Sequence, residues 1–306
     1  MEGELKKASA IDATPRLRAS HFDGVIQAGG VLDRIVEAKA VRVLKAQSAE
    51  VFEPDPFGPA VASLSGNAFL KSISVSGRVN VIAEIKRRSP SKGLIRADFD
   101  PVRIAEAYHW GGAAALSILT EEDFFDGSLD FLRAVSSSLP GIPLLRKDFI
   151  FAESQVYESR AAGADAMLLI TAILGDPLLS RLIGLAIEQG VAPLVEVHSE
   201  REMKRALAAG ATIIGVNNRD LTDFSVSLDT SLELAAMAPP GVTLISESGI
   251  NTGDDVARLR DVGYSAFLVG EHLMRAADPG QALSQLIAGA HGSACSQASA
   301  GEETND

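Results

Sequence analysis

Four charged side chains stand at the ends of apolar runs in this chain. Glu84 and Lys86 are two residues apart, so they point to the same side if their run is a strand. Lys147 and Glu196 are charged residues at the ends of two later apolar runs. A buried ammonium or carboxylate is costly unless it is paired or used. Because such groups can donate and accept protons, we interpret them as candidates for acid–base chemistry.

Three further apolar runs also end in polar residues. For any single charged residue at such a position, the alternative to a functional role is an ordinary strand end exposed to solvent. That alternative is weakest for Glu84 and Lys86. His198 stands where a helix could begin, so we expect a structural or exposed role for it. The three runs end in Asn217-Asn218-Arg219, Glu247-Ser248-Gly249 and Gly270-Glu271.

Two glycines indicate where an anion could bind. Gly249 and Gly270 follow the last two expected strands, where barrels commonly hold phosphate on backbone N–H groups and helix N-termini. The pair predicts a small phosphorylated ligand. A carboxylate aimed at phosphate would repel it, so we expect the amide of Glu271 to face the ligand and its side chain to point away.

The loop Arg87–Ala97 mixes Ser, Pro, Lys and Gly. An ordinary flexible connection explains this composition. The alternative is a mobile lid carrying a cation, which would exclude water from a polar reaction.

A repeat predicts the elements that position these residues. Short apolar runs behind a glycine recur about every 50 residues, and a second series lies half a period away. Helical spacing fills the intervals, so strand and helix alternate. This predicts a (β/α)8 barrel, with a doubly wound sheet as the alternative, although no Gly-x-Gly-x-x-Gly follows the first strand. The expected strands are 79–85, 114–119, 142–146, 165–170, 192–197, 212–217, 242–246 and 265–269.

The chain is expected to form one domain. Val31–Ala46 predicts an additional helix before the first strand, and the barrel domain with this helix covers 31–290. Residues 1–30 are expected to be a flexible extension and 291–306 a disordered polar tail.

Composition excludes several classes of protein. The 306 residues carry a net charge of −12, which disfavours a nucleic-acid binder. The single cysteine, Cys295, rules out an intrachain disulfide and a cysteine-rich metal site. The longest apolar stretch, Ala166–Leu174, is far shorter than the roughly 20 residues of a membrane span. We expect a cytoplasmic protein without a membrane partner.

Taken together, the strand ends resemble indole-3-glycerol phosphate synthases, and the resemblance covers about Val31–Gly289. The matching stretches run in order through the chain. They are Val81–Ser91, Leu116–Glu122 with Phe125–Gly127, Leu145–Ile150, Leu194–Val197, Ile214–Leu221, Ser246–Ile250 and Phe267–Arg275.

The resemblance implies a substrate, 1-(2-carboxyphenylamino)-1-deoxyribulose 5-phosphate, and no metal or organic cofactor. The substrate would close its ring with loss of carbon dioxide and water. By similarity, Lys147 would be the general acid on the ketone, and Glu196 the acid or base of later steps. Lys86 would bind the carboxylate and could donate the proton for dehydration. The sequence leaves open which lysine acts at which step.

The resemblance also assigns the surrounding residues. Glu84 would hold Lys86, and Arg219 would face the anionic substrate. Phosphate would lie on Gly249, Gly270 and the amide of Glu271, with Ser89 closing from the first loop. Asn217, Glu247 and Ser248 would orient the substrate hydroxyls and the catalytic groups. Phe125, Phe149 and Leu221 would form an apolar slot for the aromatic ring of the substrate.

Two other functions remain open at this stage. One is another phosphate-binding barrel enzyme, such as a Schiff-base aldolase using Lys147 or a sugar isomerase. The other is an inactive barrel kept as a binding scaffold, against which the full acid–base set argues. The expected partner is a small phosphorylated molecule, and the expected assembly is a monomer or weak homodimer.

Overall fold

The structure, a computed structural model, describes residues 22–49, 65–220 and 223–300. Its centre is a closed barrel of eight parallel strands in the order β1-β10-β9-β8-β7-β6-β5-β4. Strand β1 closes it by pairing Asn80 with Ala266 on one side and Ile82 with Ala115 on the other. The strands are β1 Asn80–Ile85, β4 Ala115–Leu119, β5 Leu144–Lys147, β6 Ala166–Ile170, β7 Ala192–Val197, β8 Ile213–Asn217, β9 Thr243–Glu247 and β10 Ala266–Val269. The predicted (β/α)8 barrel is confirmed.

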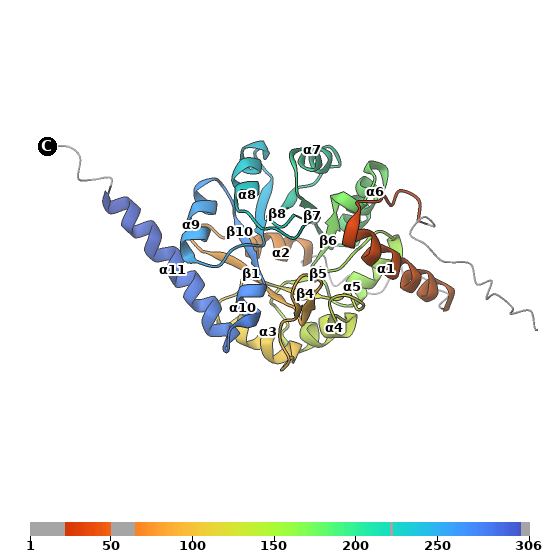
Figure 1. The fold of residues 1–306 in the computed structure, drawn as a ribbon, viewed down its shortest axis with the longest axis horizontal. Helices are drawn as coiled ribbons and strands as arrows, with labels where there is room; N and C mark the ends of the chain where they lie inside the picture. The colour runs from red at the N-terminus through yellow and green to blue at the C-terminus, as the bar shows by residue number, and fades with distance from the viewer. Residues whose placement is uncertain (1–21, 50–64, 221–222, 301–306) are drawn as a thin grey trace, which may run out of the picture.

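Helices surround the barrel (Figure 1). Several begin at residues that cap free N–H groups: Asp100 accepts from Val102 and Arg103, and Ser199 accepts from Glu202. The helices that follow the strands are α3 Pro101–Trp110, α4 Leu129–Ser138, α5 Glu153–Ala161, α6 Asp176–Glu188, α7 Glu200–Ala208, α8 Asp229–Leu234, α9 Gly253–Asp261, α10 Glu271–Arg275 and α11 Pro279–Ala300, with short 3-10 turns η2 Thr171–Ile173 and η3 Ala235–Met237.

Two helices precede the barrel in the described part of the chain, where the sequence predicts one. Helix α1, Gly30–Ala49, contains the predicted helix. Helix α2, Ser65–Ile73, is additional, and it contacts strands β1, β4, β6 and β7. Its Phe69 and Ile73 are fully buried. We attribute the missed helix to its length, since a nine-residue segment gives a weak periodic signal.

The described part of the chain includes some residues of the expected flexible extension and of the expected disordered tail. Before α1, Val25 forms an isolated bridge with Leu174. Helix α11 packs on α3 and α9 and continues past 290 to Ala300. Residues 1–21 and 301–306 lie outside the described part, so the domain boundaries stay a prediction. No helix of the described segments is long and apolar enough to cross a membrane.

The first loop carries local structure that the sequence does not reveal. Strands β2, Arg88–Ser89, and β3, Gly93–Leu94, form a small antiparallel ribbon. Arg88 at its base donates to Asp126 at 2.9 Å. The loop is therefore folded beside the mouth of the barrel.

Candidate active site

Lys147 lies at the centre of a charged cluster in the barrel mouth. Its Nζ is 2.8 Å from Oε2 of Glu196 and 2.7 Å from Oε2 of Glu247. Glu84 completes the cluster from β1, and all three carboxylate residues are buried. The four residues come from β1, β5, β7 and β9, which are alternate strands of the barrel. Alternate strands supply one interior layer in such barrels, so the topmost layer here is ionic.

Burial and charge act in opposite directions on this cluster. Burial would lower the pKa of Lys147, but the carboxylates, Glu196 first, outweigh it and raise that pKa well above its usual range. Burial would raise the pKa of Glu196, yet Lys147 and His198 lower it. For Glu247, burial outweighs the opposing effect of Lys147 and raises the pKa to about 7. One carboxylate is thus held ionised while the other can hold a proton near neutral pH.

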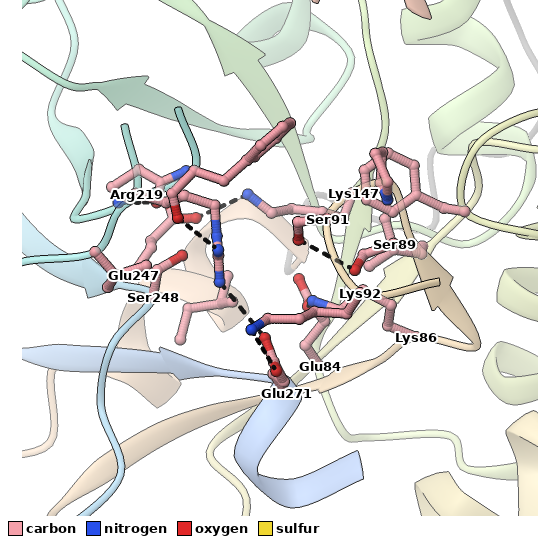
Figure 2. A pocket seen from close by; sticks show the side chains of 18 of the residues that line it. Glu84, Lys86, Ser89, Ser91, Lys92, Lys147, Arg219, Glu247, Ser248 and Glu271 are labelled. Carbon is pink, nitrogen blue, oxygen red and sulfur yellow. Dashed lines mark hydrogen bonds and ion pairs between the residues drawn. The ribbon is translucent and has the colours of Figure 1, made fainter. Parts of the chain in front are cut away.

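Lys86 forms a second ion pair beside this layer, with Glu84 as its partner. Both point into the same cavity, as their spacing of two residues predicts. Figure 2 shows them near Lys147. The ammonium groups of Lys147 and Lys86 therefore have different surroundings, because Lys147 contacts two carboxylates and Lys86 contacts one.

Two glycines make room for the carboxylates. A Cβ at Gly270 would lie 2.3 Å from Oε1 of Glu84, and a Cβ at Gly215 would lie 2.0 Å from Oε1 of Glu247. Any larger residue would push these side chains out of position. Gly270 thus has a packing reason besides the expected phosphate contact.

The side chain of Glu271 does not point away from the site as expected. Its carboxylate lies 3.5 Å from Arg219, 3.1 Å from Arg275 and 3.9 Å from Lys92 (Figure 2). The difference arises because three cations lie within 4 Å of this carboxylate. Arg219 also donates to the carbonyl of Phe224 at 3.2 Å, which fixes its position.

A cavity of about 610 Å³ brings together the expected site residues. The exception is Leu221, which lies outside the described residues. Phe125 and Phe149 form one apolar wall, with ring centroids 6.2 Å apart. The expected residues that line the cavity are Glu84, Lys86, Ser89, Phe125, Lys147, Phe149, Glu196, Asn217, Arg219, Glu247, Ser248, Gly249, Gly270 and Glu271.

Helix α1 also lines the cavity, and the sequence analysis did not predict this contribution. Val31, Leu32 and Ile35 line it, and the latter two are buried. The signal that could have found them is the apolar spacing of three to four residues that joins Ile35 to Leu32 and Val31 on one face of the helix.

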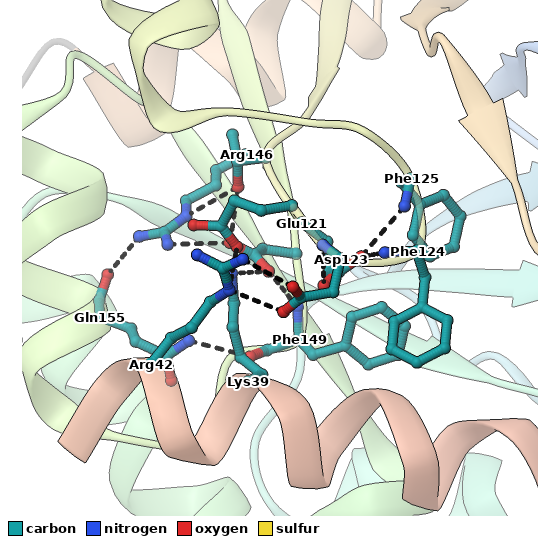
Figure 3. Close-up of polar contacts among 12 residues, drawn as sticks. Lys39, Arg42, Glu121, Asp123, Phe124, Phe125, Arg146, Phe149 and Gln155 are labelled. Atoms are coloured by element: carbon teal, nitrogen blue, oxygen red, sulfur yellow. Dashed lines mark hydrogen bonds and ion pairs between the residues drawn. The ribbon is translucent and has the colours of Figure 1, made fainter. Parts of the chain in front are cut away.

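A buried ionic network connects α1 to β5. Lys39 Nζ lies 2.9 Å from Oδ1 of Asp148 and 2.8 Å from Oε2 of Glu122. Arg146 holds the other oxygen of Asp148 at 2.9 Å. Figure 3 shows Lys39 and Arg42 reaching from the helix toward the loop after β4. Because Asp148 directly follows Lys147, the network fixes the backbone that carries the central ammonium.

The geometry defines a class of protein: an enzyme on a (β/α)8 barrel whose ionisable groups meet at the carboxyl ends of the strands. The sequence pattern of one such family, described as "Indole-3-glycerol phosphate synthase", matches residues 32–286. The chain belongs to the indole-3-glycerol phosphate synthase family. As a member, it is a carboxy-lyase that acts on a small phosphorylated substrate.

Individual relatives agree with this assignment. An indole-3-glycerol phosphate synthase of Polaromonas naphthalenivorans (strain CJ2) is 51% identical over 71% of this chain and 82% of the relative. One from Polaromonas sp. (strain JS666) is 45% identical over 84% of this chain and 98% of the relative. The crystal structure of 3-hexulose-6-phosphate synthase from Salmonella typhimurium covers 69% of this chain and 99% of that chain, with a TM-score of 0.54 and 15% identity, and so supports the fold alone.

Proposed function

We propose that the cavity closes the indole ring of 1-(2-carboxyphenylamino)-1-deoxyribulose 5-phosphate, with Lys147 as the general acid that protonates the ketone. The observation that carries this role is the ion pairing of Lys147 with Glu196 and Glu247 in a buried site. These pairs keep the ammonium charged, and a charged donor makes a carbonyl more electrophilic. Loss of carbon dioxide and water then gives indole-3-glycerol phosphate, an intermediate of tryptophan biosynthesis.

The other charged residues divide the remaining work. Glu196 serves as acid or base in the later steps, and Asn217 hydrogen-bonds to it. Lys86, oriented by Glu84, binds the substrate carboxylate and donates the proton for dehydration. Glu247 and Ser248 orient Lys147 and the substrate hydroxyls.

The substrate's two ends bind at opposite sides of this cluster. The phosphate lies on backbone N–H groups of Gly249, Gly270 and Glu271, with Ser89 and Arg219 adding polar contacts. The aromatic ring lies in the slot lined by Phe125 and Phe149, which Leu221 completes. No metal or organic cofactor takes part. The partner is this small molecule rather than a nucleic acid or membrane, and the enzyme acts in the cytoplasm as a monomer or weak homodimer.

The pairing of Lys147 disfavours the aldolase alternative. A Schiff base forms from a neutral amine, which requires a lysine of lowered pKa. Here the pKa of Lys147 is raised, because the carboxylates outweigh burial. An inactive scaffold would not require this set of charges.

A direct assay tests the proposal. The purified chain is mixed with the carboxyphenylamino deoxyribulose phosphate, and indole absorbance and fluorescence are followed. We expect product at a rate proportional to protein concentration. Borohydride added during turnover should leave the protein mass unchanged, whereas a trapped covalent adduct on Lys147, or the absence of indole formation, would contradict the proposal.

A further inference from the structure

His198 lies between two carboxylates, one inside the site and one outside it. Its Nε2 is 3.4 Å from Oε1 of Glu196, and its Nδ1 is 3.1 Å from Oε2 of Glu202 on α7. The same oxygen of Glu202 accepts the backbone N–H of His198 at 2.8 Å. Only 13% of the side chain is exposed. The imidazole is therefore fixed in place from the helix side.

A neutral imidazole cannot satisfy this position. It has one N–H, so one of its nitrogens would present a lone pair to a carboxylate. A protonated ring donates to both. Within the described part of the chain the buried Nε2 has no hydrogen-bond partner, and Oε1 of Glu196 is the acceptor that it faces at 3.4 Å.

The charges around the ring also favour the protonated imidazole. Glu202 faces the imidazole from α7, Glu196 faces it from β7, and Glu247 faces it from β9. Lys147 lies beyond Glu196, with Nζ on the other oxygen, Oε2. Burial would lower the pKa of His198, but the carboxylates outweigh burial and raise it.

We propose that His198 is a positioning residue that, when protonated, clamps Oε1 of Glu196 and so presents Oε2 to Lys147 and the substrate. The proposal rests on the proposed role of Glu196. It gives the enzyme an upper pH limit: when His198 loses its proton, Glu196 loses a partner and can rotate. Glu202, which lies outside the cavity, sets this pH limit because its negative charge favours protonated His198.

Glu202→Gln tests the clamp without touching the cavity. Glutamine keeps an acceptor oxygen for the backbone and ring N–H groups but removes the charge. We expect the His198 ring signals in NMR, and the alkaline limb of kcat, to move to lower pH by roughly one unit, which corresponds to a tenfold loss of proton affinity. KM should stay within about threefold. Glu200→Gln is the matched control, because Glu200 lies on the same helix, is exposed and pairs with Lys204.

Two substitutions of His198 separate a positioning role from a packing role. His198→Gln keeps a donor group but cannot titrate, so the alkaline limb that belongs to His198 should vanish while the protein keeps its melting temperature within a few degrees. His198→Ala should lose about tenfold or more in kcat, and added imidazole should restore part of it.

The outcomes are distinct. An unmoved NMR titration in Glu202→Gln, a normal kcat in His198→Ala, or a loss of kcat that imidazole does not restore would each overturn the clamp. Failure of the proposed function shows differently, as wild-type protein that makes no indole while its His198 titration still responds to Glu202→Gln.

Discussion

Lys39 on α1 and Asp148, the residue that follows β5, form a buried ion pair of 2.9 Å between two parts of the chain more than a hundred residues apart. The side chain of Lys39 is 4% exposed and that of Asp148 is fully buried. The pair joins the helix that covers the cavity to the residue after Lys147. It therefore links the stability of α1 docking to the geometry of the site.

Replacing Lys39 should destabilise the fold. Lys39→Met leaves Asp148 with Arg146 as its remaining cation and Glu122 with Arg42 at 4.0 Å. Removing one partner of a buried pair costs about 3–5 kcal/mol. Chemical denaturation should report this loss. Lys45→Met, an exposed position on the same helix, should change the unfolding free energy by less than about 0.5 kcal/mol. Equal stability of the two variants would mean that the pair contributes nothing.

The same pair predicts how stability depends on pH. Burial would raise the pKa of Asp148, but Lys39 and Arg146 lower it well below its usual range. A lowered pKa in the folded state stabilises above the unfolded value of about 3.9, and this stabilisation is lost as pH falls through the folded pKa. In Lys39→Met the loss of one cation should raise the pKa of Asp148. The difference in unfolding free energy from wild type should therefore narrow as pH falls from 7 through the raised pKa of the variant toward the lowered pKa of wild type. A difference in unfolding free energy between wild type and Lys39→Met that is constant over this range would contradict the effect of Lys39 on the pKa of Asp148.

Gly270→Ala should disturb Glu84 and, through it, Lys86. The added Cβ would meet Oε1 of Glu84 at 2.3 Å, so the carboxylate must move. We expect a loss of about 1–3 kcal/mol in stability, as for overpacked cores, and a fall in kcat/KM. Gly184→Ala is the control, because a Cβ there meets nothing within 4 Å. Adding Glu84→Asp to Gly270→Ala should recover stability; if it does not, the contact with Glu84 is not the cause.

Arg219→Ala should weaken substrate binding more than it slows the chemistry. A hydrogen bond to a charged group contributes about 1.5–3 kcal/mol, so KM should rise roughly tenfold to a hundredfold. Steady-state kinetics measure both constants, with exposed Arg258→Ala as the control. An unchanged KM with a lower kcat would instead give Arg219 a chemical role.

The sequence predicts the barrel well because its signal is local. Each strand is a short apolar run behind a glycine, and the observed strands begin and end within two residues of the expected bounds. The charged layer follows from the same reasoning, since Glu84, Lys147, Glu196 and Glu247 stand at strand ends that must converge.

Other parts of the site depend on contacts that sequence periodicity does not encode. The position of α1 over the cavity is set by tertiary pairs such as Lys39 with Asp148. The direction of Glu271 depends on Arg219 and Lys92, which come from two other loops. His198 is predicted to be structural or exposed because it stands where a helix could begin. Its approach to Glu196 depends on the tertiary placement of that helix start, which periodicity does not encode.

The role of Lys147 as general acid is tested most directly by kcat and KM of Lys147→Ala, measured beside the exposed control Lys204→Ala. Circular dichroism must first show that both variants fold, because the change leaves Glu196 and Glu247 without their shared cation. A well-placed acid is worth roughly 10²–10⁴ in rate, so kcat of Lys147→Ala should fall by that factor while KM stays within about tenfold. Turnover equal to wild type, or a defect wholly in KM, would contradict the role of Lys147 as the general acid.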